Sequence, residues 1–168
     1  MSAAIEKDID DFRFQFDSMY VGGIPRLLDD VGAFLAFLTI LTATDALAGV
    51  WNPTLGSGER FKGFVQAYFP ADLKPRAEDL WCFRNLMVHA SNPGPFALVC
   101  NQSRLHLTPH GEVTVLNAQD FYAALIYASQ NYFKDLVQDQ GLRSNFKRRI
   151  AEKDGGAPDS YIGSRVVT

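Results

Sequence analysis

The chain has 168 residues, a length that fits one domain with a single core. Hydrophobic residues make up 47% of the sequence, aromatic residues 12% and charged residues 21%, a composition that excludes an intrinsically disordered chain. The net charge of -3 excludes a strongly basic nucleic-acid-binding domain, so any contact with RNA or DNA would require a local basic patch.

The first predicted elements are helical. Residues 5–19 form an irregular amphipathic opening, which could be a helix or an arm, and a glycine pair breaks the chain after it. Pro25 suits the first turn of a following helix. Apolar residues at spacings of three and four predict that this helix runs to about Ala48 and ends at Gly49. We expect it to be central in the core.

The most membrane-like stretch, residues 31–44, lies within that helix. It carries no charge, but a membrane-spanning helix needs about 20 apolar residues, and aspartates flank this stretch closely. We interpret it as a buried core helix. Residues 1–12 carry acidic side chains early and no apolar run, which predicts no signal peptide. We therefore expect no membrane contact and a cytoplasmic location.

The middle of the chain alternates between turn signals and helical spacing. Residues 51–58 are predicted to be a loop, and residues 59–68 a helix that Pro70 closes. Pro75 begins the next predicted helix, over residues 76–90. Short runs of β-favouring residues separated by polar turns then follow. They predict a small antiparallel insertion, either a hairpin or a three-stranded meander.

The last predicted elements are again helical. Asn117 is a plausible N-cap for a long helix over residues 118–137, and residues 142–151 are predicted to form a short final helix. The predicted fold is therefore mainly α, with residues 1–153 as one helical-bundle domain that carries a small antiparallel β insertion at about residues 96–116. Residues 154–168 are predicted to be a flexible tail.

One stretch carries chemical meaning: Arg84-Asn85-Leu86-Met87-Val88-His89, near the end of a predicted helix. Each helical residue advances about 100°, so Asn85 and His89 share one side with Trp81. Arg84 lies about 140° from His89 by the same arithmetic, but its long side chain can cover much of that gap. Arginine binds phosphate oxygens in pairs, histidine exchanges protons near neutral pH, and asparagine can orient either of them. Together these groups could cleave RNA without a metal.

A structural interpretation of the same residues is also open, because single cations on an amphipathic helix are usually solvated or paired. Asp45 lies at the polar end of the apolar helix. A buried carboxylate there needs a cationic partner, and Arg84 and Arg60 are the candidates. We therefore interpret Asp45 as one half of a structural ion pair rather than as a catalytic acid.

The six-residue stretch resembles the signature of the HEPN superfamily, in which an arginine, a polar residue, variable positions and a histidine lie near the end of a bundle helix. The order of Asp45, a glycine-rich turn before Arg60, the motif and the β insertion is similar to an uncharacterised bacterial HEPN-like group. The resemblance covers roughly residues 20–150. It implies a four- or five-helix bundle that dimerises, so that motifs from two chains meet in one composite site.

The resemblance also implies roles for individual residues. Arg84 would bind phosphate, His89 would be the acid or base, and Asn85 would be the polar helper, with Asp45 and Arg60 in support. Many members of the superfamily are metal-independent ribonucleases, and others keep the fold without catalysis. The expected partners are a second copy of the chain and single-stranded RNA, with no cofactor and no metal.

Three hypotheses about function follow. The first is a HEPN-type endoribonuclease that acts as a homodimer. The second is a non-catalytic HEPN-like interaction module, in which Arg84 makes intramolecular pairs and His89 packs away from solvent. The third is a phosphate- or nucleotide-binding domain built around Arg84. The position of the Arg84–His89 helix end is expected to distinguish the first hypothesis from the second.

Other polar residues have plainer interpretations. Cys82 and Cys100 lack metal-ligand spacing, so we interpret them as small buried core residues. His106 and His110 are predicted to be exposed turn or strand residues rather than metal ligands. The basic residues within 143–149 are interpreted as a solvated helix face, although an RNA-facing patch is the alternative.

Overall fold

The secondary structure is that of a computed structural model, which describes residues 3–154. The helices are α1 (Ala3–Phe16), α2 (Ala33–Trp51), α3 (Ser57–Tyr68), α4 (Ala77–Ala90), α5 (Ala118–Gln138) and α6 (Gln140–Asp154). The strands are β1 (Phe96–Val99), β2 (Pro109–His110) and β3 (Val113–Asn117). The prediction of a mainly α fold with a small β insertion is confirmed. The predicted tail lies, from residue 155 on, outside the described residues.

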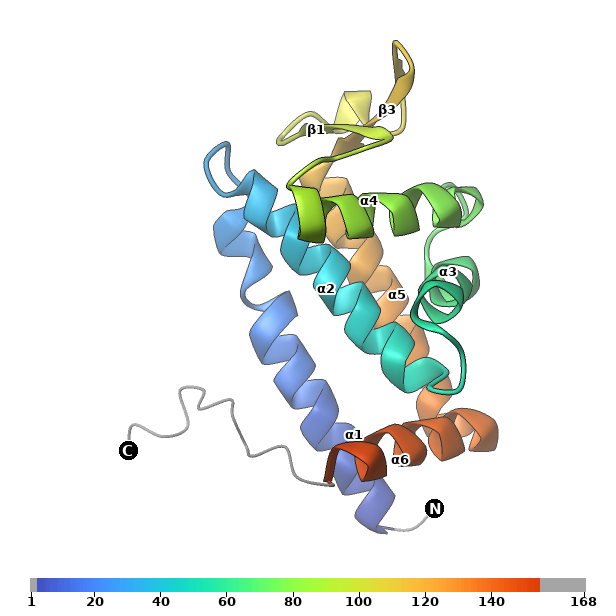
Figure 1. The fold of residues 1–168 in the computed structure, drawn as a ribbon. Coiled ribbons are helices and arrows are strands. Elements are labelled where there is room, and N and C mark those ends of the chain that lie inside the picture. Colours follow the sequence, from blue (N-terminus) through green and yellow to red (C-terminus); the bar gives the residue numbers. More distant parts are fainter. Residues whose placement is uncertain (1–2, 155–168) are drawn as a thin grey trace.

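Helix α2 runs through the middle of the bundle, as predicted (Figure 1). It packs against α3, α4, α5 and α6, and its Phe37 ring contacts Phe83 of α4 and Phe121 of α5 at centroid distances of 6.0 and 6.1 Å. The buried Thr44 hydroxyl donates to the carbonyl of Ile40, so it does not interrupt the apolar packing. By length and composition alone α2 could cross a membrane, but over half of its residues are buried inside the protein.

The predicted limits of this central helix were wrong at both ends. Residues Ile24–Leu27 form only a short 3-10 turn. The Asp29 carboxylate then accepts hydrogen bonds from the backbone N–H groups of Val31 and Gly32, which replaces helical bonding and delays the start of α2. Gly49 does not end the helix, because it is buried where α6 packs across α2. Tertiary packing here outweighs the low helix propensity of glycine, which by itself would favour a helix end.

The other helices follow the predicted order with shifted ends. The N-terminal segment is helix α1 rather than an arm, and it buries Ile5, Ile9 and Phe16. The predicted helix over residues 76–90 is α4 together with a 3-10 turn (Lys74–Arg76). The last helix begins two residues earlier than predicted, since the Asp139 carboxylate accepts a hydrogen bond from the N–H of Leu142.

The small sheet covers one end of the bundle (Figure 1) and has the strand order β1-β3-β2. Strand β1 pairs with β3 in parallel, whereas β2 pairs with β3 antiparallel. The predicted hairpin or meander, antiparallel throughout, is therefore wrong. Residues 100–112 form a connection long enough for a parallel pair, and its 3-10 turn (Ser103–Leu105) includes the first residue of the β-favouring run at residues 105–108.

Polar side chains join this connection to the start of α5. Asn117 occupies the N-cap position as predicted, but its side chain does not cap the helix. Its amide oxygen accepts a hydrogen bond from the N–H of Gln102, and its amide nitrogen donates to Asp120. The backbone N–H of Asn117 donates to Nδ1 of His106 at 3.2 Å. His106 is therefore a half-buried acceptor and not the exposed residue that was predicted.

The contact of His106 predicts a pH dependence of stability. Burial lowers the pKa of His106 below its ordinary value of 6.5, and the positive charge of Arg76 lowers it further. The negative charges of Asp120 and Asp72 raise this pKa, but they do not outweigh the effect of burial. The unfolded chain therefore binds a proton more readily, so the stabilisation is complete above pH 6.5 and declines as the pH falls below that value. The free energy of unfolding, measured by urea denaturation at pH values from about 7.5 down to 5.5, should show this decline.

A glutamine at this position supplies the matched comparison. His106→Gln keeps a hydrogen-bond acceptor and does not titrate, so this variant should lose less stability than the wild type over the same range. His110→Gln, at an exposed position in β2, should follow the wild type. Equal pH slopes for the wild type and His106→Gln would contradict the assignment.

Candidate active site

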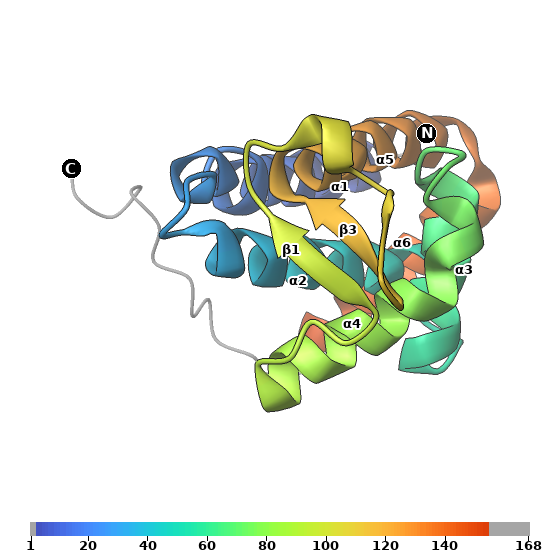
Figure 2. The same ribbon diagram turned by 90° about the horizontal axis from the view of Figure 1, so that it is seen from above.

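The motif lies on the last turns of α4, where the chain folds back sharply. Ser91 adopts a left-handed conformation with φ 50°, and the backbone N–H of Asn92 donates to the carbonyl of Leu86 at 3.2 Å. Gly94 also has a positive φ, and a Cβ there would lie 2.6 Å from Cδ1 of Leu86. This position therefore requires glycine. Val88 and the last residues of the helix are exposed, and the end of α4 lies at the outer edge of the molecule in Figure 2.

The Arg84 guanidinium is held by three neighbours. Its Nη2 donates to Oδ2 of Asp45 at 2.7 Å, and its Nη1 donates to the amide oxygen of Asn85 at 3.2 Å. Its Cζ lies 5.4 Å from the centre of the Trp81 ring, in a cation–π contact. The long side chain thus reaches the side of α4 that carries Trp81 and Asn85, as predicted. Arg84 keeps 23% of its side chain exposed.

The Trp81 ring that lies beside Arg84 is supported by α3. It contacts the buried Phe61 ring at a centroid distance of 5.5 Å. A Cβ at Gly58 would lie 3.1 Å from the Trp81 indole, so the glycine lets the ring lie close against the first turn of α3. Residues that were predicted to form a glycine turn therefore have a second use, because Gly58 lies within α3 and makes room for Trp81.

Of the two candidate partners for Asp45, the structure selects Arg84. The Asp45 side chain is 20% exposed, and its Oδ1 is buried without a hydrogen-bond partner among residues 3–154. Arg60 makes no hydrogen bond or ion pair with Asp45 in this part of the chain, and its buried Nε also lacks a partner there. The ion pair joins the central helix α2 to α4, whereas Arg60 is not drawn into this cluster.

Tyr20 is a member of the cluster that the sequence did not reveal. It lies in a π-helical turn (Asp17–Val21), and its ring contacts Phe16 at a centroid distance of 5.1 Å. Burial and the negative charge of Asp45 both raise the pKa of Tyr20. No sequence spacing connects it to Asp45, because the two residues are brought together only when the turn Asp17–Val21 packs against α2.

His89 lies apart from this cluster, in an exposed position at the end of α4. Within residues 3–154 no hydrogen bond or ion pair joins it to Arg84, Asn85 or Asp45. The geometry therefore combines one expectation of each main hypothesis. Arg84 is paired within the chain, as the interaction-module hypothesis predicts, but His89 is open to solvent, as the enzyme hypothesis requires.

The remaining polar candidates divide between confirmed and corrected interpretations. Cys82 is exposed and Cys100 half-buried, so the prediction of two buried core cysteines was wrong. His110 is exposed as predicted. The described residues contain no group of three or more His, Cys, Asp or Glu side chains that could hold a metal ion.

The basic residues of α6 differ from one another in their surroundings. Lys147 and Arg148 are exposed, in agreement with the prediction of a solvated face. Arg143 is half-buried, and its guanidinium donates to the carbonyl of Val137 at 2.7 Å. Arg143 therefore contributes to the junction of α5 and α6 rather than to a solvated surface.

Comparisons of the chain with protein-family models, with curated proteins and with solved structures found no match. The arrangement of the side chains is therefore the basis for any assignment of function. That arrangement offers a fixed guanidinium and an exposed imidazole on one helix.

The ion pair between Asp45 and Arg84 makes a measurable prediction. Asp45→Ala leaves the Arg84 guanidinium half-buried without its carboxylate, which should lower the free energy of unfolding by about 1–2 kcal/mol, between the values for surface and buried pairs. Asp10→Ala, at an exposed position on α1, should change it by less than about 0.5 kcal/mol. Urea denaturation measures both, and equal losses would contradict the role given to the pair.

Proposed function

We propose that this chain is a metal-independent endoribonuclease of HEPN type, which cleaves single-stranded RNA at a composite site between two copies of the chain. One observation carries the proposal: α4 holds an arginine in a fixed position and exposes a histidine at its end. The arginine is Arg84, which contacts Asp45, Trp81 and Asn85. The histidine is His89. The sequence resemblance to the HEPN signature points to the same residues.

The Arg84 guanidinium has the properties of a phosphate-binding group. Arginine carries five N–H donors, and the hydrogen bonds to Asp45 and Asn85 use two of the nitrogens. The Nε–H and the outward N–H bonds of a side chain that is 23% exposed remain for a phosphate oxygen. The Asp45 carboxylate offsets part of the attraction, but it also holds the guanidinium in one orientation, which lowers the entropic cost of binding.

The chemistry follows from the two residue types. An imidazole acting as base takes the proton of the ribose 2′-hydroxyl, and the 2′ oxygen forms a bond to phosphorus. The bond from phosphorus to the 5′ oxygen breaks, and an imidazolium donates the proton that this leaving oxygen needs. Arg84 stabilises the negative charge that grows on the phosphate oxygens. The products are a 2′,3′-cyclic phosphate and a 5′-hydroxyl, so no water is consumed in this step.

A second copy of the chain supplies what one copy lacks. The reaction uses one proton acceptor and one proton donor, and each chain provides one histidine at this helix end. Val88 is 47% exposed beside His89, and the apolar side chains of Val31, just before α2, and Leu35, in its first turn, are 93% and 52% exposed. Exposed apolar residues of this kind favour a protein partner. A two-fold contact at the end of α4 would bring two His89 imidazoles and two Arg84 guanidinia together.

The proposal predicts cleavage of single-stranded RNA in the presence of EDTA. His89→Ala should lower the rate at least about 100-fold, since it removes general acid–base catalysis. His110→Ala is the matched control, because it removes an exposed histidine from β2 and should leave the rate unchanged. Replacing the ribose at the cleaved position with 2′-deoxyribose should stop cleavage, because the attacking oxygen is then missing.

Arg84 needs a variant that preserves the fold. Arg84→Lys keeps a cation near Asp45 but loses the fork that binds two phosphate oxygens, so cleavage should fall while the melting temperature stays close to that of the wild type. Undiminished cleavage by both His89→Ala and Arg84→Lys would refute the assignment of the site.

Dependence on the dimer makes a separate prediction. If the active species contains two chains, the rate per chain should rise with protein concentration until the dimer is saturated, and sedimentation equilibrium should show the same midpoint. Val88→Glu places a charge in the expected contact and should shift both midpoints to higher concentration. A rate per chain that stays constant while the protein dissociates into monomers would show that one chain suffices.

A non-catalytic interaction module is the second candidate, and the ion pair at 2.7 Å between Arg84 and Asp45 favours it. On this interpretation the guanidinium stabilises the junction of α2 and α4 and binds no phosphate. Dimerisation without turnover of any RNA would support the module. Binding of inorganic phosphate or a nucleotide without turnover, lost in Arg84→Lys, would instead indicate a phosphate-binding domain.

A further inference from the structure

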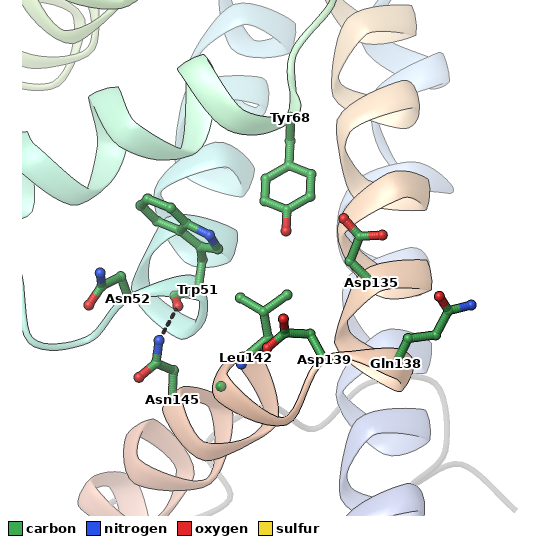
Figure 3. Close-up of a pocket in the computed structure, with 9 residues that line it drawn as sticks. Trp51, Asn52, Tyr68, Asp135, Gln138, Asp139, Leu142 and Asn145 are labelled. Atoms are coloured by element: carbon green, nitrogen blue, oxygen red, sulfur yellow. Dashed lines mark hydrogen bonds between the residues drawn. The ribbon is translucent and has the colours of Figure 1, made fainter.

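A separate cavity lies beside the C-terminal end of α2, where α2, α3, α5 and α6 come together (Figure 3). Its volume is about 630 Å³. The residues around it include Trp51, Tyr68, Asp135, Asp139 and Leu142. None of them belongs to the cluster around Arg84, so the cavity is independent of the proposed ribonuclease site.

The Trp51 wall of this cavity is held from two sides. A Cβ at Gly63 would lie 2.8 Å from the Trp51 ring, so only glycine at this place in α3 lets the indole lie against the helix. The ring also meets the buried Phe64 edge-on, at a centroid distance of 6.3 Å. From α6, the Asn145 side-chain amide donates to the carbonyl of Trp51 at 2.9 Å (Figure 3). The wall is therefore preformed.

Tyr68 forms the second aromatic wall. Tyr68 is 9% exposed, and its hydroxyl points into the cavity (Figure 3). Burial raises the pKa of Tyr68 to about 12, together with the negative charges of Asp135 and Asp139 and a hydrogen bond from the hydroxyl to the Asp135 carboxylate. The hydroxyl therefore stays protonated at neutral pH and presents a neutral polar group beside the two carboxylates.

Asp135 and Asp139 supply the charge. Asp139 begins α6, where Oδ1 accepts the hydrogen bond from the N–H of Leu142 at 2.8 Å. Among residues 5–151, whose side chains the structure describes, neither carboxylate forms a salt bridge. Arg143, one turn further along α6, donates to the carbonyl of Val137 instead. The cavity thus carries two negative charges without a cation of the described chain to balance them.

We propose that this cavity binds a small organic cation, a primary ammonium or a guanidinium carried on a short aliphatic chain. Carboxylates form their strongest hydrogen bonds with such cations, the Trp51 ring beside them attracts positive charge through its π-electrons, and the Tyr68 hydroxyl oxygen can accept a further hydrogen bond from the ligand. The Leu142 side chain offers an apolar contact to the aliphatic part. An anion would be repelled, and a neutral ligand would leave both carboxylates without a counter-charge.

The chemistry recognised here is shared by free diamines and by the lysine side chain of another protein. Titration with 1,4-diaminobutane, agmatine and N-acetyl-lysine-N-methylamide separates these sources. 1,4-Butanediol is the matched neutral control, because it has the same chain length as 1,4-diaminobutane without the charge.

The experiment uses the indole N–H signals in ¹H–¹⁵N NMR spectra of the whole chain. The sequence contains two tryptophans, and Trp81→Phe identifies the signal of Trp51. A saturable shift of that signal with at least one of the cationic ligands, and no shift with butanediol, is the expected result. The apparent affinity should fall as salt is added, since it depends on charge.

Two charge-neutral replacements test the carboxylates. The double variant Asp135→Asn and Asp139→Asn keeps an N-cap at the start of α6 but removes both charges, and it should weaken binding about tenfold or more. Asp10→Asn, at an exposed position on α1, should bind the cations as tightly as the wild type. The proposal is overturned if no cation gives a saturable shift, if butanediol gives the same shift, or if the double variant binds as tightly as the wild type.

Discussion

The fold depends on covering an apolar helix from several sides. Asp45 is the one charged residue in α2, and the rest of that helix is packed by α3, α4, α5 and α6. A carboxylate in such a position is costly unless a cation meets it. Arg84 meets it from α4 at 2.7 Å. The ion pair therefore fixes how α4 crosses the central helix, and the placement of the motif follows from this requirement.

The same contact between Arg84 and Asp45 could serve the stability of the fold, the proposed chemistry of the site, or both. An arginine that is stacked beside Trp81 and bonded to Asp45 has lost most of its freedom before any ligand arrives. Such preorganisation is useful for stabilising charge in a transition state, although it also serves a purely structural role. The two uses make different demands on His89: the proposed chemistry needs its imidazole, whereas a structural role needs only its exposed position at the helix end, where the helix dipole favours a cation.

The two ends of α2 have opposite characters. Near its beginning the exposed side chains of Val31 and Leu35 are apolar. At its end Trp51 borders a cavity with the carboxylates of Asp135 and Asp139. The junction of α5 and α6 forms one side of that cavity. It is held by the hydrogen bond from the Leu142 N–H to Asp139 and by the hydrogen bond from Arg143 to the carbonyl of Val137. This difference supports the two separate proposals, a protein partner near one end and a small cation at the other.

Local chemistry in the sequence was enough to predict the helical class, the central apolar helix, the helix that carries Arg84 and the pairing of Asp45 with a cation. These features depend on periodicity, on proline and on the cost of a buried charge, all of which act over short distances or through residue type. The sequence did not predict Tyr20 beside Asp45, the acceptor role of His106, the parallel pairing of β1 with β3, or the cavity beside Trp51. Each of these requires segments far apart in the chain to meet, and the burial and close approach that result are properties of the packed structure alone.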